Sequence, residues 1–146
     1  MSIDTKDVAE FFSRYEGLFN RAVNGEADLE AIKALYTNQF ISATPKGIHT
    51  GAIDASFEAV MSKGYERYRE MGTKSVKVEG IEVHEVDDAH CVARVWWNSI
   101  YQKPGENEIH IPFHASYLLQ QKHGDLKVFG WITGDEDELL KAKGVL

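Results

Sequence analysis

The spacing of apolar residues changes once along the chain, and this change limits the fold more than any other feature. Before Gly72 apolar residues recur three and four positions apart, as on one face of an α-helix. After Gly72 they alternate with polar residues, as in half-buried strands. Helices followed by strands predict an α+β fold around one core. No repeat or linker interrupts the 146 residues, so we expect residues 1–146 to form a single domain.

Three helices are predicted in the first half of the chain. The first covers residues 8–22 and ends near Asn24-Gly25, which is a good helix stop. The second covers 28–36. A short strand at 40–44 and a turn follow, and the third helix covers 53–71. We expect the segment between the short strand and the third helix to be a crossover loop.

The second half predicts long antiparallel strands and a last short helix. The strands are expected at 76–86, 91–100, 109–121 and 126–133. The alternation slips near Glu79-Gly80, which indicates a β-bulge. The final helix begins at Asp135, and Glu138 three residues later completes a capping-box pattern.

Alternation also assigns side chains to the two faces of the strands. The set with the more apolar character is expected to face the helices: Cys91, Ala93, Val95, Trp97, Ser99 and Tyr101 in one strand, and Ile109, Ile111, Phe113, Ala115, Tyr117 and Leu119 in the next. Side chains grow in size toward Trp97 and Tyr101, which would taper a cavity. Buried tyrosines need partners for their hydroxyl groups, so several on interior faces favour a cavity with sparse polar groups. Solid packing of the same rings is the alternative.

A ligand-binding role is predicted for a set of residues expected to border this cavity. They are Tyr15, Phe19, Tyr36, Thr44, Trp97, Tyr101, Phe113 and Tyr117. Their aromatic character favours a small hydrophobic or aromatic organic molecule as the partner. Trp96 is predicted to point outward beside Arg94 and Asn98, as an anchor for a homodimer or beneath a loop.

Charge and motif content argue against several classes of protein. The net charge is −7 with no basic stripe, so we expect no nucleic-acid partner. No apolar run is long enough to cross a bilayer, and the N-terminus lacks a signal pattern. The single cysteine fits a reducing compartment. Together these features predict a cytoplasmic location. His110 and His114 would lie ~13 Å apart on a strand, too far to share an ion. We expect neither a metal nor a nucleotide cofactor.

The C-terminal region resembles the closing motif of SnoaL-like proteins in the spacing of Trp131, Asp135, Leu139-Leu140 and Gly144. Residues 27–36 resemble the second helix of that superfamily, which is nuclear transport factor 2-like or ketosteroid isomerase-like, and residues 44–51 resemble its strand-to-helix crossover. The resemblance implies a cone-shaped, curved antiparallel sheet wrapped round about three N-terminal helices, with a short C-terminal helix. It also implies a pocket between sheet and helices, and dimers.

The same resemblance leaves the activity open, including whether the chain is an enzyme. Thr44 stands where the ketosteroid isomerases place a carboxylate base, and Ala115 stands where they place a protonated aspartate, so that reaction looks absent. In SnoaL-type cyclases an acid in this C-terminal region is important, and the matching Asp135 is interpreted first as a helix cap. Catalysis would be cyclase-, isomerase- or dehydratase-like, without cofactor, using tyrosine hydroxyls or His49. The alternative is a non-catalytic, dimeric interaction or assembly module of the same fold.

Overall fold

A computed structural model describes residues 3–146 and confirms the α+β class. In that part of the chain the elements are α1 (Thr5–Val23), α2 (Leu29–Lys33), β1 (Tyr36–Thr44), β2 (Gly47–Ala52), α3 (Ala55–Glu70), β3 (Thr73–Glu85), β4 (His90–Tyr101), β5 (Ile109–Lys122), β6 (Asp125–Thr133) and α4 (Glu136–Ala142). None of these helices is long and apolar enough to cross a membrane.

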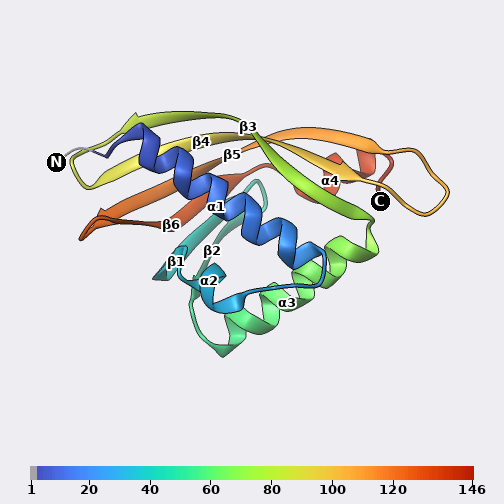
Figure 1. Cartoon of the computed structure of the whole chain (residues 1–146), viewed down its shortest axis with the longest axis horizontal. Helices are drawn as coiled ribbons and strands as arrows, with labels where there is room; N and C mark the ends of the chain where they lie inside the picture. The colour runs from blue at the N-terminus through green and yellow to red at the C-terminus, as the bar shows by residue number, and fades with distance from the viewer. Residues whose placement is uncertain (1–2) are drawn as a thin grey trace.

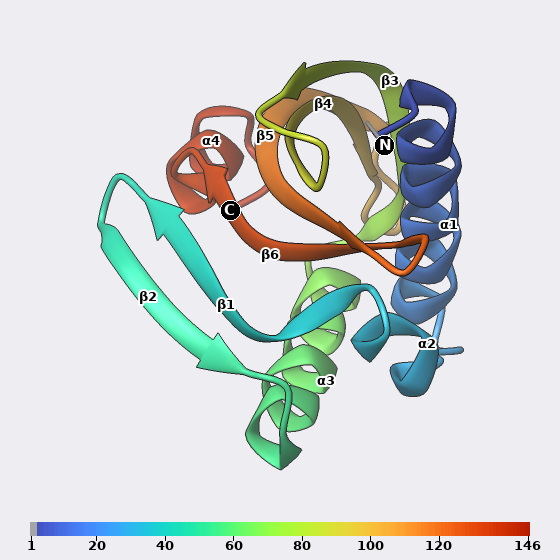
Figure 2. The same ribbon diagram turned by 90° about the vertical axis from the view of Figure 1, so that its left-hand side faces the viewer.

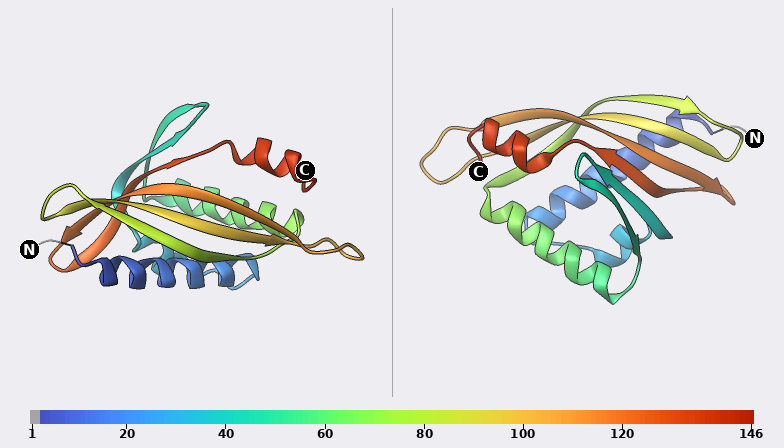
Figure 3. Two further views of the ribbon diagram at one scale, coloured as in Figure 1. Left: turned by 90° about the horizontal axis from the view of Figure 1, so that it is seen from above. Right: turned by 180° about the vertical axis from the view of Figure 1, so that it is seen from behind.

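The strands form one curved, open sheet in the order β2-β1-β6-β5-β4-β3. Neighbouring strands are antiparallel, except that β1 and β6 run parallel. Helices α1, α2 and α3 lie on one side of the sheet (Figure 1), and the β1–β2 hairpin extends away from the rolled part formed by β3 to β6 (Figure 2). Seen from above, α1 follows the β3 side and α4 lies beyond the end of β6 (Figure 3). The predicted curved sheet around N-terminal helices is confirmed.

The segment from residue 28 to residue 55 differs from the prediction. Helix α2 ends at Lys33 rather than near Tyr36, because Tyr36 is already extended as the first residue of β1 and pairs with Val128 of β6. The expected crossover loop contains strand β2, which pairs with β1 through Ser42 opposite His49. Strand β2 is short and mostly exposed, so it lacks the alternation that would have revealed it.

Strand β3 carries the predicted bulge. Val78 lies opposite Trp97 and Gly80 lies opposite Trp96, so Glu79 is the extra residue. A bulge bends its strand and increases the local twist, which contributes to the curvature of the sheet at this edge.

The predicted interior face of β4 is buried throughout, from Cys91 to Tyr101. Phe12 of α1 packs onto this face, with its ring centre 4.9 Å from that of Tyr117 and 6.4 Å from that of Trp97. A second, smaller core joins Met71, Tyr101, Ile111, Leu140 and Val145 and attaches α4 to the sheet. Burial of Cys91, which also raises the pKa of its thiol, agrees with a structural cysteine.

Helix α1 is attached to β3 by hydrogen bonds between side chains and the backbone. The Asn20 side chain accepts from the Val76 amide (2.8 Å) and donates to the Val76 carbonyl (3.0 Å), and the Glu16 carboxylate accepts from the Val78 amide (3.0 Å). These bonds satisfy backbone groups on the outer edge of the sheet, where no further strand pairs. They therefore fix the position of α1 along the sheet.

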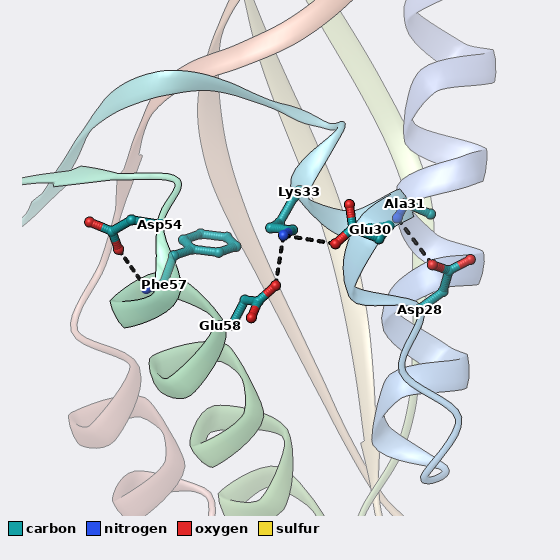
Figure 4. Close-up of polar contacts among 7 residues, drawn as sticks. All are labelled: Asp28, Glu30, Ala31, Lys33, Asp54, Phe57 and Glu58. Carbon is teal, nitrogen blue, oxygen red and sulfur yellow. Dashed lines mark hydrogen bonds and ion pairs between the residues drawn. The ribbon is translucent and has the colours of Figure 1, made fainter.

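Helices α2 and α3 are joined by one lysine. Lys33 Nζ lies 2.8 Å from Glu30 and 2.6 Å from Glu58 of α3, and these hydrogen bonds raise the pKa of the lysine (Figure 4). Asp28 and Asp54 accept backbone amides at the starts of α2 and α3. Asp135 caps α4 in the same way, accepting the Glu138 amide at 3.0 Å, as predicted.

Asn20→Ala should lower the free energy of unfolding by about 1–3 kcal/mol, because both backbone groups of Val76 lose their partner in a part-buried contact. Urea unfolding followed by circular dichroism measures this. Asn107→Ala, in the exposed loop before β5, is the control and should stay within about 0.5 kcal/mol of the wild type. Equal effects of the two substitutions would contradict the role of Asn20.

Candidate ligand-binding site

A cavity of about 680 Å³ lies between the sheet and helices α1 and α3. Its size falls within the range of roughly 300–1,000 Å³ that is usual for small-molecule sites. Strand β6 pairs with β5 only as far as Thr133, opposite Ala115, so the earlier part of β5 has no neighbour on that side. The cavity reaches the surface at exposed residues that include Val60, Pro112 and Glu136.

All six tyrosines of the chain line this cavity. They come from four different regions, namely α1, the start of β1, α3 and the interior faces of β4 and β5: Tyr15, Tyr36, Tyr65, Tyr68, Tyr101 and Tyr117. Trp97, Trp131, Phe19, Phe57 and Phe113 complete the aromatic wall. The cavity is therefore apolar over most of its surface but carries many hydroxyl groups.

Seven of the eight residues predicted to bind a ligand lie in this wall. Thr44 is not among the lining residues. It pairs with Gly47 at the end of the β1–β2 hairpin, and its hydroxyl accepts from the Lys46 amide at 3.2 Å. His49 is exposed on β2 and does not line the cavity either. Contact of any of these residues with a ligand stays a prediction.

The inner end of the cavity contains a cluster of buried hydroxyl groups. Trp97 Nε1 donates to the Tyr117 hydroxyl at 3.1 Å. Burial raises the pKa of Tyr15, Tyr36 and Tyr117, and side-chain hydrogen bonding with Tyr36 and Tyr117 partly offsets that rise for Tyr15. All three hydroxyls therefore stay protonated at neutral pH, and they are suited to donate to an oxygen or nitrogen atom of a ligand.

A second polar group lies further along β4. Ser99 and Thr73 are buried beside Tyr101, and burial raises the pKa of the Tyr101 hydroxyl more than these neighbours lower it. Thr73 is a lining residue, but its hydroxyl oxygen is itself buried, and hydrogen bonding with this hydroxyl lowers the pKa of Tyr101.

Glu136, at the first position of α4, supplies a carboxylate to the cavity wall. The Tyr68 hydroxyl of α3 donates to Glu136 Oε1 at 2.9 Å. The residue as a whole is exposed, yet desolvation of its carboxyl group raises its pKa, while the Tyr68 hydrogen bond and the charge of Arg67 lower it. Such a carboxyl group is able to exchange a proton with a bound molecule. Glu136 and Asp135 are thus the two acidic residues among those that line the cavity.

Sequence reasoning missed Tyr65, Tyr68 and Glu136. Tyr65 and Tyr68 lie within the predicted third helix, and a position on such a helix does not distinguish a packed core from a cavity wall. For Glu136 a signal was available: side chains in the first turn lean toward the start of the helix, here toward the end of β6. The neighbouring cap residue Asp135 had seemed the more informative acid.

No group of three or more histidine, cysteine or acidic residues in the described part of the chain is arranged to hold a metal ion.

Comparisons with known proteins agree with this architecture. Residues 6–136 match the model of the family described as NTF2-like protein (DUF6841). The chain belongs to this family. The resemblance to the nuclear transport factor 2-like superfamily is thereby confirmed. Comparison of this NTF2-like protein with curated proteins gives no significant match.

Solved structures share the fold at low sequence identity. An NTF2-like protein with a cystatin-like fold from Novosphingobium aromaticivorans has a TM-score of 0.70 and 16% identity, covering 98% of this chain and 88% of that one. The association domain of CaMKII from C. elegans has a TM-score of 0.67 and 9% identity, covering 88% of this chain and 92% of that one. A ketosteroid isomerase-like protein from Erwinia carotovora atroseptica has a TM-score of 0.57 and 16% identity, covering 86% of this chain and 91% of that one. At these identities the likeness shows the fold alone.

Glu136→Gln should change how stability depends on pH. Because the pKa of Glu136 is raised in the folded protein, the folded state holds the proton more tightly, and stability is lost as pH rises from the ordinary value of 4.5 through the raised one. The variant lacks this loss, so its free energy of unfolding relative to wild type should increase across that window. Tyr68→Phe removes the hydrogen bond that lowers the pKa of Glu136, so this variant should lose more stability than the wild type as the pH rises. Urea unfolding between pH 4 and 8 tests both variants. If the free energy of unfolding depended on pH in the same way in all three proteins, the raised pKa of Glu136 would be contradicted.

Proposed function

We propose that this NTF2-like protein binds a small, mainly hydrophobic or aromatic organic molecule in the cavity. The observation that carries the proposal is the lining of the cavity. A space of about 680 Å³ is bordered by aromatic rings, which include all six tyrosines of the chain. Sites for small molecules combine these features, a mostly apolar surface and a few polar groups that orient the ligand.

The polar groups of the wall support binding over a solid core. If the aromatic rings served only to pack, phenylalanine would fill the same positions without hydroxyl groups that need partners. A guest would restore the dispersion contacts that an empty space lacks.

The same wall would support a reaction without a cofactor. Glu136 would accept or return a proton, and the buried tyrosine hydroxyls would stabilise negative charge that develops on the bound molecule. Cyclase-, isomerase- and dehydratase-like reactions need these two elements. The fold likeness to a ketosteroid isomerase-like protein supports this extension. His49, which had been considered for such a step, has no part in it because it lies outside the cavity.

Gly64→Leu should abolish binding without unfolding the protein. Gly64 lines the cavity from α3, and a Cβ atom placed there meets no other atom within 4 Å. The leucine side chain would occupy the space of the ligand, while replacement of a helical glycine favours the helix by up to about 1 kcal/mol. Thermal unfolding against steroids, aromatic phenols, terpenoid alcohols and fatty acids measures the outcome. A binder at a hundredfold excess over its Kd adds about 2.7 kcal/mol, a shift of several degrees.

The matched control is Gly17→Leu in α1. A Cβ atom at Gly17 also meets nothing within 4 Å, but the residue is exposed and does not line the cavity. This variant should gain the same helix preference and keep the shift produced by the ligand. Loss of the shift in both variants, or retention in both, would contradict binding in the cavity.

A second candidate function, assembly through the outer face of the sheet, is favoured by exposed apolar side chains. Strand register places Ile41, Ile48, Trp96 and Ile132 on that face, with exposed fractions of 44%, 71%, 37% and 54%. Exposed apolar patches of this kind mark contact surfaces. The fold likeness to an association domain supports the homodimer expected from Trp96.

Trp96→Glu should shift the protein from dimer to monomer in sedimentation velocity, because the outer face would carry a charge at the centre of the contact. Val86→Glu is the control, since Val86 is 65% exposed at the β3–β4 turn, away from that face. An unchanged sedimentation coefficient for Trp96→Glu would remove this face as the interface.

A further inference from the structure

The charge of the cavity wall limits which hydrophobic molecules it can accept. None of the thirty lining residues is a lysine or an arginine, whereas Asp135 and Glu136 are both acidic. The chain as a whole carries a net charge of −7. An anionic guest would therefore meet repulsion at long range and would find no lysine or arginine in the wall.

Neighbouring acids at the start of α4 are already paired. Asp135 lies 3.8 Å from Lys46, and Asp137 lies 2.8 Å from Arg67. In the part of the chain that the structure describes, Glu136 forms no ion pair of its own, its side chain accepts a hydrogen bond from the Tyr68 hydroxyl on Oε1, and the charge of Arg67 acts on it at longer range. Its second oxygen, Oε2, is left without a protein partner.

The aromatic wall favours positive charge in the same region. The faces of tyrosine and tryptophan rings carry negative electrostatic potential and attract ammonium groups within about 6 Å of the ring centre. Tyr68 contacts Glu136 through its hydroxyl group, at the edge of its ring, so an ammonium group bound to Glu136 would also lie close to this phenol oxygen.

We propose that the ligand is a hydrophobic amine in its ammonium form. Its nitrogen binds Glu136 beside the Tyr68 hydroxyl, and its apolar body fills the space between the aromatic rings. The inference rests on the proposed function of the cavity and deepens it by naming the class of ligand. Fatty acids and other carboxylates are excluded by the same charges.

A matched series of probes tests the charge directly. Isothermal titration calorimetry at pH 7.5 and low salt compares 2-naphthylmethylamine, 2-naphthalenemethanol and 2-naphthoic acid. A second series carries the same aminomethyl, hydroxymethyl and carboxyl groups on a biphenyl ring system. The amine should bind about tenfold or more tightly than the alcohol, because a hydrogen bond between charged groups is stronger than a neutral one. The acid should bind more weakly than the alcohol.

Two variants assign the preference to one carboxylate. Glu136→Gln should bring the affinity for the amine down to about that for the alcohol, so that the ratio of the two dissociation constants falls to about one. Glu138→Gln removes the same unit of charge two residues away, outside the cavity wall, and should keep the preference. Equal binding of amine and alcohol by wild type, or a preference that survives Glu136→Gln, would overturn the inference and leave the pocket function standing. Absence of binding by every probe, together with no thermal shift in the broad panel, would overturn both.

Discussion

The attachment of α1 to the bulged edge strand determines where the other walls of the cavity lie. Asn20 and Glu16 occupy the backbone hydrogen-bonding positions that a further strand would otherwise fill. With the helix held there, Phe12 and Tyr15 contact Trp97 and the neighbouring ring of Tyr117. Since α1 covers the β3 side, the rest of the concave face is covered by α3 and the first turn of α4, which enclose a space rather than fill it.

Much of the sheet could be predicted because its long strands each bury one face. The interior residues of β4 and β5 and the bulge at Glu79 follow from alternation alone. Of the β1–β2 hairpin, the sequence predicted residues 40–44 of β1 and the turn after them, but neither the start of β1 nor β2. Strand β1 pairs in parallel with β6, nearly ninety residues later in the chain, and β2 is exposed on both faces. Local sequence carries no trace of a pairing that depends on so distant a partner.

The residues of the candidate site could be predicted where they lie on the alternating strands, but several that lie on helices could not. Residues on alternating strands, such as Trp97, Phe113 and Tyr117, were placed in the wall because the strand fixes the direction of each side chain. Tyr65 and Glu136 were missed because their roles arise where separate helices meet the sheet. Thr44 was chosen from its match to a position in the superfamily, and here the hairpin places it outside the wall.

The three tryptophans are divided between the two surfaces to which functions are assigned. Trp97 is buried and bonded to Tyr117, and Trp131 stacks on Phe40 with ring centres 5.1 Å apart, so both indoles border the cavity. Trp96 is 37% exposed on the opposite face. Indole emission depends on the polarity around the ring, so a guest and a second subunit would each alter the fluorescence of different residues. The protein therefore carries separate intrinsic optical reporters for its interior and for its outer face.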